Sequence, residues 1–537
     1  MTIRPFKTGQ SREQGSFLPP RIADYVGADN PVRAIDAYVG SLDLVALRFR
    51  HADHAEVAGQ PPYDPADLLK LYLYGYTNQI RSSRRLAREA ARNVELIWLL
   101  RGLTPGYRSI AKFRSANAAA LKAANQDFVL LLRSLDLVGG ELVAIDGAFF
   151  HGDASQASIV TRDRLAKQLA AVERDITDYA AALEANDAAE AAEPQAPPGG
   201  DVAGKLAALL ARRAAAQADL AKLEASGATQ LSRTDGDARL LSKTGQSVAG
   251  YNVQIAVDDK HKLIVASDVV NDGNDTGQLH AMALAAKQAL DAATLKAVAD
   301  TGYYNGATLK ACEEAGIEAF VPEPNRGQPA AADGRFGLDA FAYDAEADTY
   351  RCPAGEQLRP MPGRKLDATG KLRIRYASRR SACRSCPLRQ RCLSPKADRR
   401  VIERWEHEAV VERHRARMTR PDAQAAVRRR KALAEYPFGT LKCRAGYRHF
   451  LLRGFDKVRG EWSLMALCYN VTRLISILGL DALIRYLAER WPNSPLPLLA
   501  AVISAVGHIQ RRGADIWTAA GPSAGKMSCT GRYGCTA

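Results

Sequence analysis

The chain has 537 residues, which at about 100–200 residues per domain predicts three or four structural units. Its 47% hydrophobic and 25% charged residues are typical of a globular protein and exclude a wholly disordered or collagen-like chain. No apolar run reaches the roughly 18 residues of a membrane span, and no apolar stretch near Met1 indicates a secretion signal. Nine cysteines, an odd number, favour a reducing compartment. We therefore expect a soluble, cytoplasmic protein with no membrane partner.

Positive charge is concentrated in one part of the chain. The formal net charge is +15, and the segment from Lys371 to Gly460 alone holds 26 Lys or Arg against 8 Asp or Glu. Such a field attracts polyanions and speeds their encounter with the protein. A solvated basic face is the simpler explanation, but aromatic residues and glycines are interleaved with the arginines, as between Arg444 and Arg448. The pattern favours a nucleic-acid-binding surface, and with it a nucleoid-associated protein.

The first 135 residues have the periodicity of short helices joined by tight turns. Asp64 followed by Pro65 is a typical helix start, because Asp caps a helix and Pro is tolerated at the first position. Basic residues near the helix starts predict a helix-turn-helix-like DNA-binding domain, in which Arg108, Lys112 and Arg114 contact the DNA. A plain helical bundle with a charged exterior is the alternative.

The middle of the chain alternates between strand and helix patterns. An apolar strand at 141–150 reaches its end at Asp146 and Gly147, and a later apolar strand ends at Asp300. Between them, two apolar runs at 251–270 flank a short polar turn, which predicts a β-hairpin. The order of elements predicts an α/β fold with a mixed sheet and helices.

Changes in composition divide the chain further. Residues 326–400 are rich in glycine, proline and cysteine, and the residues that follow them have mostly helical periodicity. The expected units are a helical N-terminal DNA-binding domain (1–135), the first part of a catalytic domain (140–325) with a helical-hairpin insertion (162–228), a Cys-rich insertion (326–400), the C-terminal part of the catalytic domain (401–490), and a partly disordered tail (491–537).

Two aspartates occupy the same kind of position. Asp146 and Asp300 each follow an apolar strand and precede a glycine-containing turn. Functional groups of open α/β sheets lie at the carboxyl ends of strands. Two neighbouring carboxylates repel unless a cation lies between them, and hard oxygen ligands suit Mg²⁺. Two Mg²⁺ ions about 4 Å apart would serve phosphodiester chemistry. For each Asp alone, a loop cap or a salt-bridge partner is the plainer interpretation.

A two-metal site normally needs a third carboxylate. Glu435 is the best candidate, since it lies within the most basic stretch of the chain. The sequence alone leaves other candidates open, namely Glu403, Glu406, Glu408 and Glu412.

Four cysteines lie close together in the chain. Cys383, Cys386 and Cys392 follow Cys352 by about thirty residues, in a loop-rich segment with few apolar residues. Four thiolates, two of them at CxxC spacing, suit tetrahedral zinc, and a short segment without much core needs a staple. We therefore predict a structural Zn²⁺ site. Thioredoxin-like redox chemistry is the alternative, but no strand–helix unit carries this CxxC.

Several segments taken together resemble the DDE-type insertion-sequence transposases, in the group whose catalytic domain carries a Cys-rich insert. With the N-terminal helices they extend over most of residues 1–480. The segments are AIDGAFF, GYNVQIAVDDKHKLIVASDVVNDGNDTGQL, ADTGYYN, AEYPFGTLK and GYRHFLLRGFDKVRGEWSLMALCYNVTRL.

The resemblance implies an RNase H-like catalytic domain with Asp146, Asp300 and Glu435 as its acidic triad. Related transposases often carry Tyr-x2-Arg-x3-Glu-x6-Lys around the glutamate. At those positions this chain has Arg428, Lys431, Glu435 and Lys442, so that the Tyr is replaced by Arg and the Arg by Lys. Pro437 limits any claim that Glu435 and Lys442 share a helix face, because the residue before a proline avoids the α region.

The expected function is metal-dependent cleavage of DNA at the ends of an insertion sequence, followed by transfer of the freed 3′-OH into target DNA. The partners would be the inverted-repeat ends, the target DNA and further copies of the chain in a homodimer or higher multimer. Phosphate contacts are assigned to the basic region, with Lys442, Arg444 and Arg448 next to the metals. An inactive DNA-binding descendant and a metal-dependent nuclease without strand transfer are the alternatives.

Overall fold

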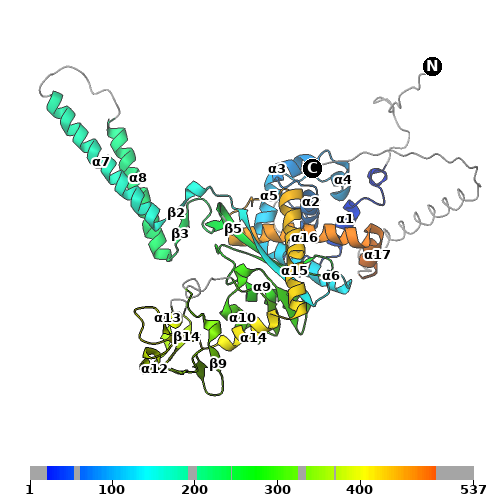
Figure 1. Ribbon diagram of the computed structural model, residues 1–537. Coiled ribbons are helices and arrows are strands. Elements are labelled where there is room, and N and C mark those ends of the chain that lie inside the picture. Colours follow the sequence, from blue (N-terminus) through cyan, green and yellow to red (C-terminus); the bar gives the residue numbers. More distant parts are fainter. Residues whose placement is uncertain are drawn as a thin grey trace, which may run out of the picture. The chain divides into compact units, whose positions relative to one another are not determined.

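The computed structural model describes residues 21–53, 61–190, 202–243, 245–324, 334–367 and 370–490. The expected tail at 491–537 and the Pro/Gly loop at 191–201 lie outside these residues. The chain divides into two compact units (Figure 1), one made of residues 1–120 with 471–537 and the other of residues 121–470. We describe each unit separately.

The first unit is entirely helical where it is described. Its elements are η1 (Ile22–Tyr25), α1 (Val32–Gly40), α2 (Pro65–Thr77), α3 (Ser83–Ala90), α4 (Val94–Leu99), α5 (Tyr107–Ala116) and, from the far end of the chain, α17 (Leu480–Arg490), which packs on α1. The predicted start of α2 is confirmed, since Asp64 Oδ1 accepts a hydrogen bond of 2.8 Å from the Ala66 amide. Tyr72 lies at the centre of the unit, stacked on Phe113 and fully buried.

The second unit is built around a mixed six-stranded sheet. After α6 (Ala118–Ser134), the strands are β1 (Leu142–His151), β4 (Arg239–Lys243), β5 (Gln246–Asp258), β6 (Ile264–Val270), β7 (Leu295–Val298) and β8 (Ile317–Phe320). Their order is β4-β5-β1-β7-β8, with β6 paired to β5. β5 and β6 form the antiparallel hairpin that the sequence predicts, whereas β7 is parallel to both β1 and β8. This is a mixed α/β fold.

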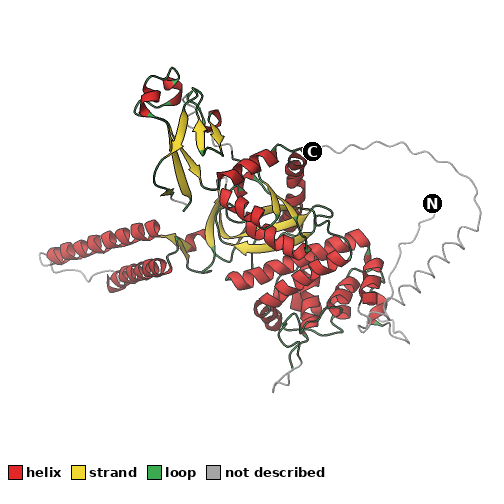
Figure 2. Ribbon diagram, turned by 90° about the horizontal axis from the view of Figure 1, so that it is seen from below, coloured by secondary structure: helices red, strands yellow, loops and turns green. Residues whose placement is uncertain are grey.

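Helices cover both faces of this sheet (Figure 2). On one face, α9 (Leu279–Leu290) and α10 (Gly306–Glu314) bury a core that contains Ile145 and Ala256. On the other face, α15 (Pro421–Gly439) packs on Ala144 and Val298. α14 (Glu408–Met418) precedes α15, and α16 (Phe455–Leu478) follows it. Alternate residues of β1 therefore face the α9 side and the α15 side.

Two further substructures extend from the second unit (Figure 1). The first is an antiparallel pair of long helices, α7 (Arg162–Glu190) and α8 (Val202–Ser226), joined to the sheet by the short strands β2 (Ile159–Thr161) and β3 (Gln230–Ser232). We call it the helical arm. It has a small core of its own, formed by Val160, Leu165, Ala216 and Leu223.

The second substructure is another six-stranded sheet. It contains β9 (Ala342–Asp344), β10 (Thr349–Arg351), β11 (Gln357–Pro360), β12 (Lys365–Leu366), β13 (Leu372–Ala377) and β14 (Val401–Trp405), with the short helices α12 (Arg380–Arg384) and α13 (Arg389–Cys392). Tyr350, Leu358, Tyr376 and Ile402 are buried in its core. The expectation of too little apolar material for a core is therefore wrong. Helix also resumes later than expected, because Val401–Trp405 is a strand.

Candidate active site

Asp146 and Asp300 lie on neighbouring parallel strands. Ala144 of β1 is paired with Val298 of β7, and each aspartate lies two residues beyond that pair. β1 does not end at Asp146 as predicted, because it continues to His151 in antiparallel pairing with β5. β7 ends at Val298, so the sheet opens beside Asp146 at this point. The two carboxylates thus belong to one edge of the opening.

Asp146 is an unfavourably placed carboxylate. Its side chain is only 14% exposed, and burial, together with the negative charge of Asp300, raises its pKa to about 6. The guanidinium of Arg430, on α15, opposes this shift, with 3.5 Å between Nη1 and Oδ2. The Gly147 amide also donates to Oδ1 at 2.9 Å. One cation at long range does not fully compensate the buried charge.

Asp300 is held by the turn that follows β7. Its Oδ1 accepts a hydrogen bond of 2.8 Å from the Gly302 amide and so caps η3 (Thr301–Tyr303). The plain interpretation of Asp300 as a loop cap is therefore correct, but it leaves Oδ2 available beside Asp146.

Glu435 lies on the same helix as Arg430, five residues further along. It is exposed on α15, which continues through Pro437 to Gly439 before a π-helical turn at Thr440–Arg444. Five residues along a helix correspond to a rotation of roughly 140°, so Glu435 and Arg430 leave α15 on different sides. In the described part of the chain, no three His, Cys, Asp or Glu side chains converge on a point where a metal ion would fit.

The structure brings residues to the site that the sequence did not single out. Arg430, rather than its neighbours Arg428 and Lys431, contacts Asp146. Helix rotation separates these three side chains, because only Arg430 falls on the face of α15 that packs on the sheet. Asp275 is the second missed residue: it is 5% exposed and lies behind β1, within hydrogen-bond reach of side chains from β5. Asp275 belongs to one of the segments that carry the family resemblance, but the sequence assigns it no role.

The predicted DNA contacts near Glu435 divide into two groups. Lys442 is half-buried; its Nζ donates to the Phe149 carbonyl at 2.8 Å and lies 4.5 Å from the centre of the Phe150 ring. Burial lowers its pKa to about 8. Lys442 thus packs against β1 instead of extending into solvent. The side chains of the second group are exposed to solvent, namely Arg428, Lys431, Arg444 and Arg448.

The three basic residues of α5 also differ. Arg108 and Lys112 are exposed. Arg114 is only 5% exposed, and its Nη1 donates to the Tyr76 hydroxyl at 2.9 Å. A buried guanidinium that is hydrogen-bonded inside its own unit does not reach a DNA phosphate, so we no longer assign Arg114 to DNA binding.

The four cysteines of the Cys-rich segment gather around one cavity of about 370 Å³. Burial raises the pKa of Cys392, the nearby Arg400 opposes that shift, and the charges of the three other thiols add to it. Cys383 Sγ lies 3.0 Å from the Ser378 hydroxyl. These thiols are nevertheless not arranged as a metal-holding group in the described residues.

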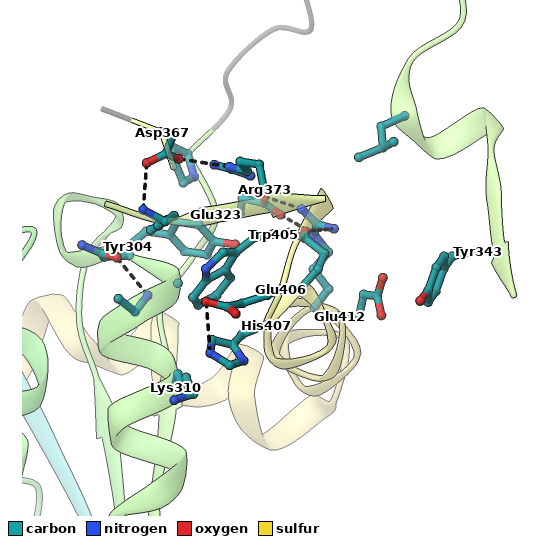
Figure 3. Close-up of a pocket in the computed structure, with 18 of the residues that line it drawn as sticks. Tyr304, Lys310, Glu323, Tyr343, Asp367, Arg373, Trp405, Glu406, His407 and Glu412 are labelled. Atoms are coloured by element: carbon teal, nitrogen blue, oxygen red, sulfur yellow. Dashed lines mark hydrogen bonds and ion pairs between the residues drawn. The ribbon is translucent and has the colours of Figure 1, made fainter. Parts of the chain in front are cut away.

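A larger cavity, of about 1410 Å³, lies between the second sheet and α10 and α14 (Figure 3). Trp405, Glu406 and His407 project into it together, and Glu323 on another wall pairs with Arg415 at 2.8 Å. Seven carboxylates but only four Lys or Arg side chains line this cavity. That balance repels phosphates, so the large cavity is a poor DNA site.

Parts of the chain match known protein families. No single described helix is long and apolar enough to cross a membrane. α16 and α17 together have the length and composition of a span, but the chain bends by 105° at the break between them. The search of curated proteins found no match. Residues 351–475 match the family model described as a transposase DDE domain, which includes α15, and residues 20–116 match a transposase domain model, DUF772. These two matches support a DDE-type insertion-sequence transposase, and a DDE domain is typical of an enzyme that acts on DNA.

Proposed function

We propose that the chain cleaves DNA at the ends of its insertion sequence and joins the freed 3′-OH to target DNA, with the help of divalent metal ions. One observation carries the proposal: Asp146 and Asp300 lie side by side at the opening of the sheet, and Asp146 is buried enough to have a raised pKa. A divalent cation between the carboxylates would relieve both the burial and the repulsion.

The fold supports the same conclusion. An antiparallel β5–β6 hairpin, a central β1, two parallel strands and helices on both faces are what an RNase H-like catalytic domain requires. We therefore propose that residues 140–325 and 401–470 form such a domain, with the helical arm and the Cys-rich segment as insertions in it, whereas α17, expected in the same domain, packs on α1 of the first unit. We further propose that it works as a dimer or higher multimer on DNA in the nucleoid.

The donor set fits Mg²⁺. Carboxylate oxygens of Asp146 and Asp300 are hard ligands, and two carboxylates leave positions for water and phosphate oxygens. When bound, Mg²⁺ ions would activate the attacking oxygen and neutralise charge on the leaving oxygen. Arg430, 3.5 Å from Asp146, would hold that carboxylate in place before metal binding and then be released toward a phosphate.

We retain Glu435 as the third acid of the proposal on the family resemblance. Glu435 is exposed on α15, the helix whose Arg430 contacts Asp146, which supports its place in the proposed acidic triad.

The test of the site uses Asp146→Asn, Asp300→Asn and Glu435→Gln, with Glu403→Gln as the control. Each of the three should abolish Mg²⁺-dependent cleavage of a duplex that carries the element's end, while binding of that duplex stays near wild type. Glu435→Gln with full activity would remove Glu435 from the site, and full activity of either Asp→Asn variant would refute the proposed function.

DNA contacts are proposed for the exposed basic residues. Arg444 and Arg448 follow α15 closely and would hold the strand next to the acids, together with Arg428 and Lys431. Replacing Arg444 and Arg448 by Ala should flatten the slope of log K against log salt by about 2, since each phosphate contact contributes about 0.9. Adding Lys442→Ala should change this slope little further, because its amine is hydrogen-bonded to a carbonyl.

Recognition of the element's end is proposed for the first unit, through Arg108 and Lys112. A double Ala variant should lose discrimination between end-sequence and random duplexes but keep salt-sensitive general binding. Unchanged discrimination would place the sequence-reading residues elsewhere.

A structural Zn²⁺ at Cys352, Cys383, Cys386 and Cys392 is also part of the proposal, supported by the gathering of all four thiols around one cavity. Small shifts of the loops that carry them would be needed to complete a tetrahedral set. Metal analysis should give one zinc per chain. Protein without zinc, in which all four thiols react with an alkylating reagent, would exclude the site.

A further inference from the structure

The side chain of Gln254 crosses over the strand that carries Asp146. Gln254 on β5 lies directly opposite Gly147 on β1. Its Nε2 donates to Asp275 Oδ1 at 2.7 Å, and its Oε1 accepts a hydrogen bond from the Tyr303 hydroxyl. Tyr303 belongs to the turn after β7, on the other side of β1. The carboxamide of Gln254 therefore spans from β5 across β1 to the β7 turn.

Gly147 makes this crossing possible. A Cβ at position 147 would lie 2.3 Å from Gln254 Nε2, 2.6 Å from Asp275 Oδ1 and 3.0 Å from the Tyr303 hydroxyl. No side chain fits beneath the carboxamide, so the glycine after Asp146 is required by packing.

The network is closed to water and well anchored. Asn252, Gln254 and Tyr303 are fully buried, and Asp275 is 5% exposed. Asp275 Oδ1 also accepts from Asn252 Nδ2 at 2.8 Å, and its Oδ2 lies 3.3 Å from Lys243 Nζ. Three donors thus converge on the carboxylate of Asp275, and these contacts fix the side chains that carry them.

Both catalytic candidates are tied to this network through the backbone. Asp146 immediately precedes Gly147, and Asp300 caps the same η3 turn that contains Tyr303. Neighbouring residues of β1 point to opposite faces. Asp146 therefore faces α15. Gln254 lies on the α9 side, behind the carboxylates, and links β1 to the η3 turn.

We propose that Gln254 is a positioning residue of the active site: its carboxamide, held by Asp275, fixes the turn that carries Asp300 relative to β1 and Asp146, and so sets the spacing of the two metal-binding carboxylates. This inference rests on the proposed function. Groups behind metal ligands orient them, and their loss typically lowers metal affinity or activity by about 10–100-fold.

The experiment compares three variants with wild type in the full-length protein. Gln254→Met keeps the size of the side chain but removes both hydrogen bonds. Gln254→Glu places a second carboxylate next to Asp275, and adding Asp275→Asn removes that repulsion and restores an amide donor. Gln230→Met is the matched control, since Gln230 also makes two hydrogen bonds through its carboxamide, to the backbone of Leu240 near the helical arm.

Two measurements are made on each variant: the affinity for Mn²⁺, from the EPR signal of the free ion, and the cleavage rate of end DNA as a function of Mg²⁺ concentration. Gln254→Met should lower the Mn²⁺ affinity and the cleavage rate at low Mg²⁺ about 10–100-fold, with partial recovery at high Mg²⁺. Gln254→Glu should behave similarly, and Asp275→Asn added to it should restore most of the loss. Gln230→Met should match wild type in both measurements.

The outcomes separate the two claims. Wild-type protein that neither binds Mn²⁺ nor cleaves end DNA overturns the proposed function and the inference with it. Active wild-type protein with an equally active Gln254→Met variant overturns the inference alone. So does a Gln254→Met variant whose loss is matched by Gln230→Met, or a double variant that is no better than Gln254→Glu.

Discussion

Gly147→Ala tests whether the carboxamide of Gln254 occupies the space above β1. The new Cβ would lie 2.3 Å from Gln254 Nε2, whereas ordinary contacts begin near 3.4 Å. Gln254 must therefore move by about 1 Å, which breaks its 2.7 Å hydrogen bond to Asp275 and displaces the Tyr303 hydroxyl. Each buried polar group left without its partner costs about 1–3 kcal/mol. With partial relaxation, the expected loss of stability is about 2–4 kcal/mol.

The assay is calorimetric unfolding of the full chain, in which the transition of the second unit should move to lower temperature. Gly439→Ala is the control, because Gly439 has helical backbone angles and open space where its Cβ would be. That change should stabilise the unit by about 0.5–1 kcal/mol. A Gly147→Ala variant that unfolds at the wild-type temperature would refute the crossing of β1 by Gln254.

Three further variants test other buried polar groups. Asn470 is fully buried and makes two hydrogen bonds, of 3.0 and 2.8 Å, with the backbone of Ile264 on the edge strand β6. Asn470→Ala should therefore lower the free energy of unfolding by about 2–5 kcal/mol and speed amide exchange at Ile264. Unchanged exchange would contradict this. Burial lowers the pKa of His414 below 6.5, so the folded state binds fewer protons than the unfolded state between these pKa values. The contribution of neutral His414 to the stability of the fold is therefore fully present above about pH 6.5 and decreases as the pH falls below it. His414→Gln should therefore reduce the difference between the melting temperatures at pH 7.5 and pH 5.5, and an unchanged difference would show that His414 is not the cause. Arg114→Met should destabilise the helical unit by about 1.5–3 kcal/mol, as expected for a lost hydrogen bond to a charged group. As the control, Lys112→Ala should leave the melting temperature of the unit unchanged. Equal effects of the two substitutions would mean that the burial of Arg114 is unimportant for stability.

The sequence predicted the parts of the site that depend on local pattern. Asp146 and Asp300 follow apolar runs that the sequence shows, and the parallel register of β1 and β7 places them on neighbouring strands, although β1 continues past Asp146 to His151. Arg430 could not be distinguished from its basic neighbours, because only the docked orientation of α15 decides which side chain reaches β1. The sequence predicts a DNA contact for Arg114, because its charge does not reveal that Tyr76 accepts a hydrogen bond from it inside the unit.

Long-range contacts explain what was missed. Gln254 and Asp275 are 21 residues apart, within one of the segments that carry the family resemblance, but only the folded sheet shows that they meet over Gly147. The second sheet was missed because its strands have only two to six residues, too few for a visible period. Its small core combines Tyr350 and Tyr376 with Phe341, Leu358 and Ile402, which are scattered over about sixty residues of the chain.

The way in which the helical arm joins the sheet makes it separable. α7 has 29 residues and is about 43 Å long, yet the arm leaves and re-enters the unit through the paired strands β2 and β3, with Thr161 opposite Gln230. The first and last residues of the helical arm are thus neighbours, as at the base of any hairpin. A tight turn of two to four residues between them would close the chain without stretching the sheet, and the arm would take its own small core away with it. Evolution could lengthen, shorten or exchange such an appendage while the aspartates stay where they are.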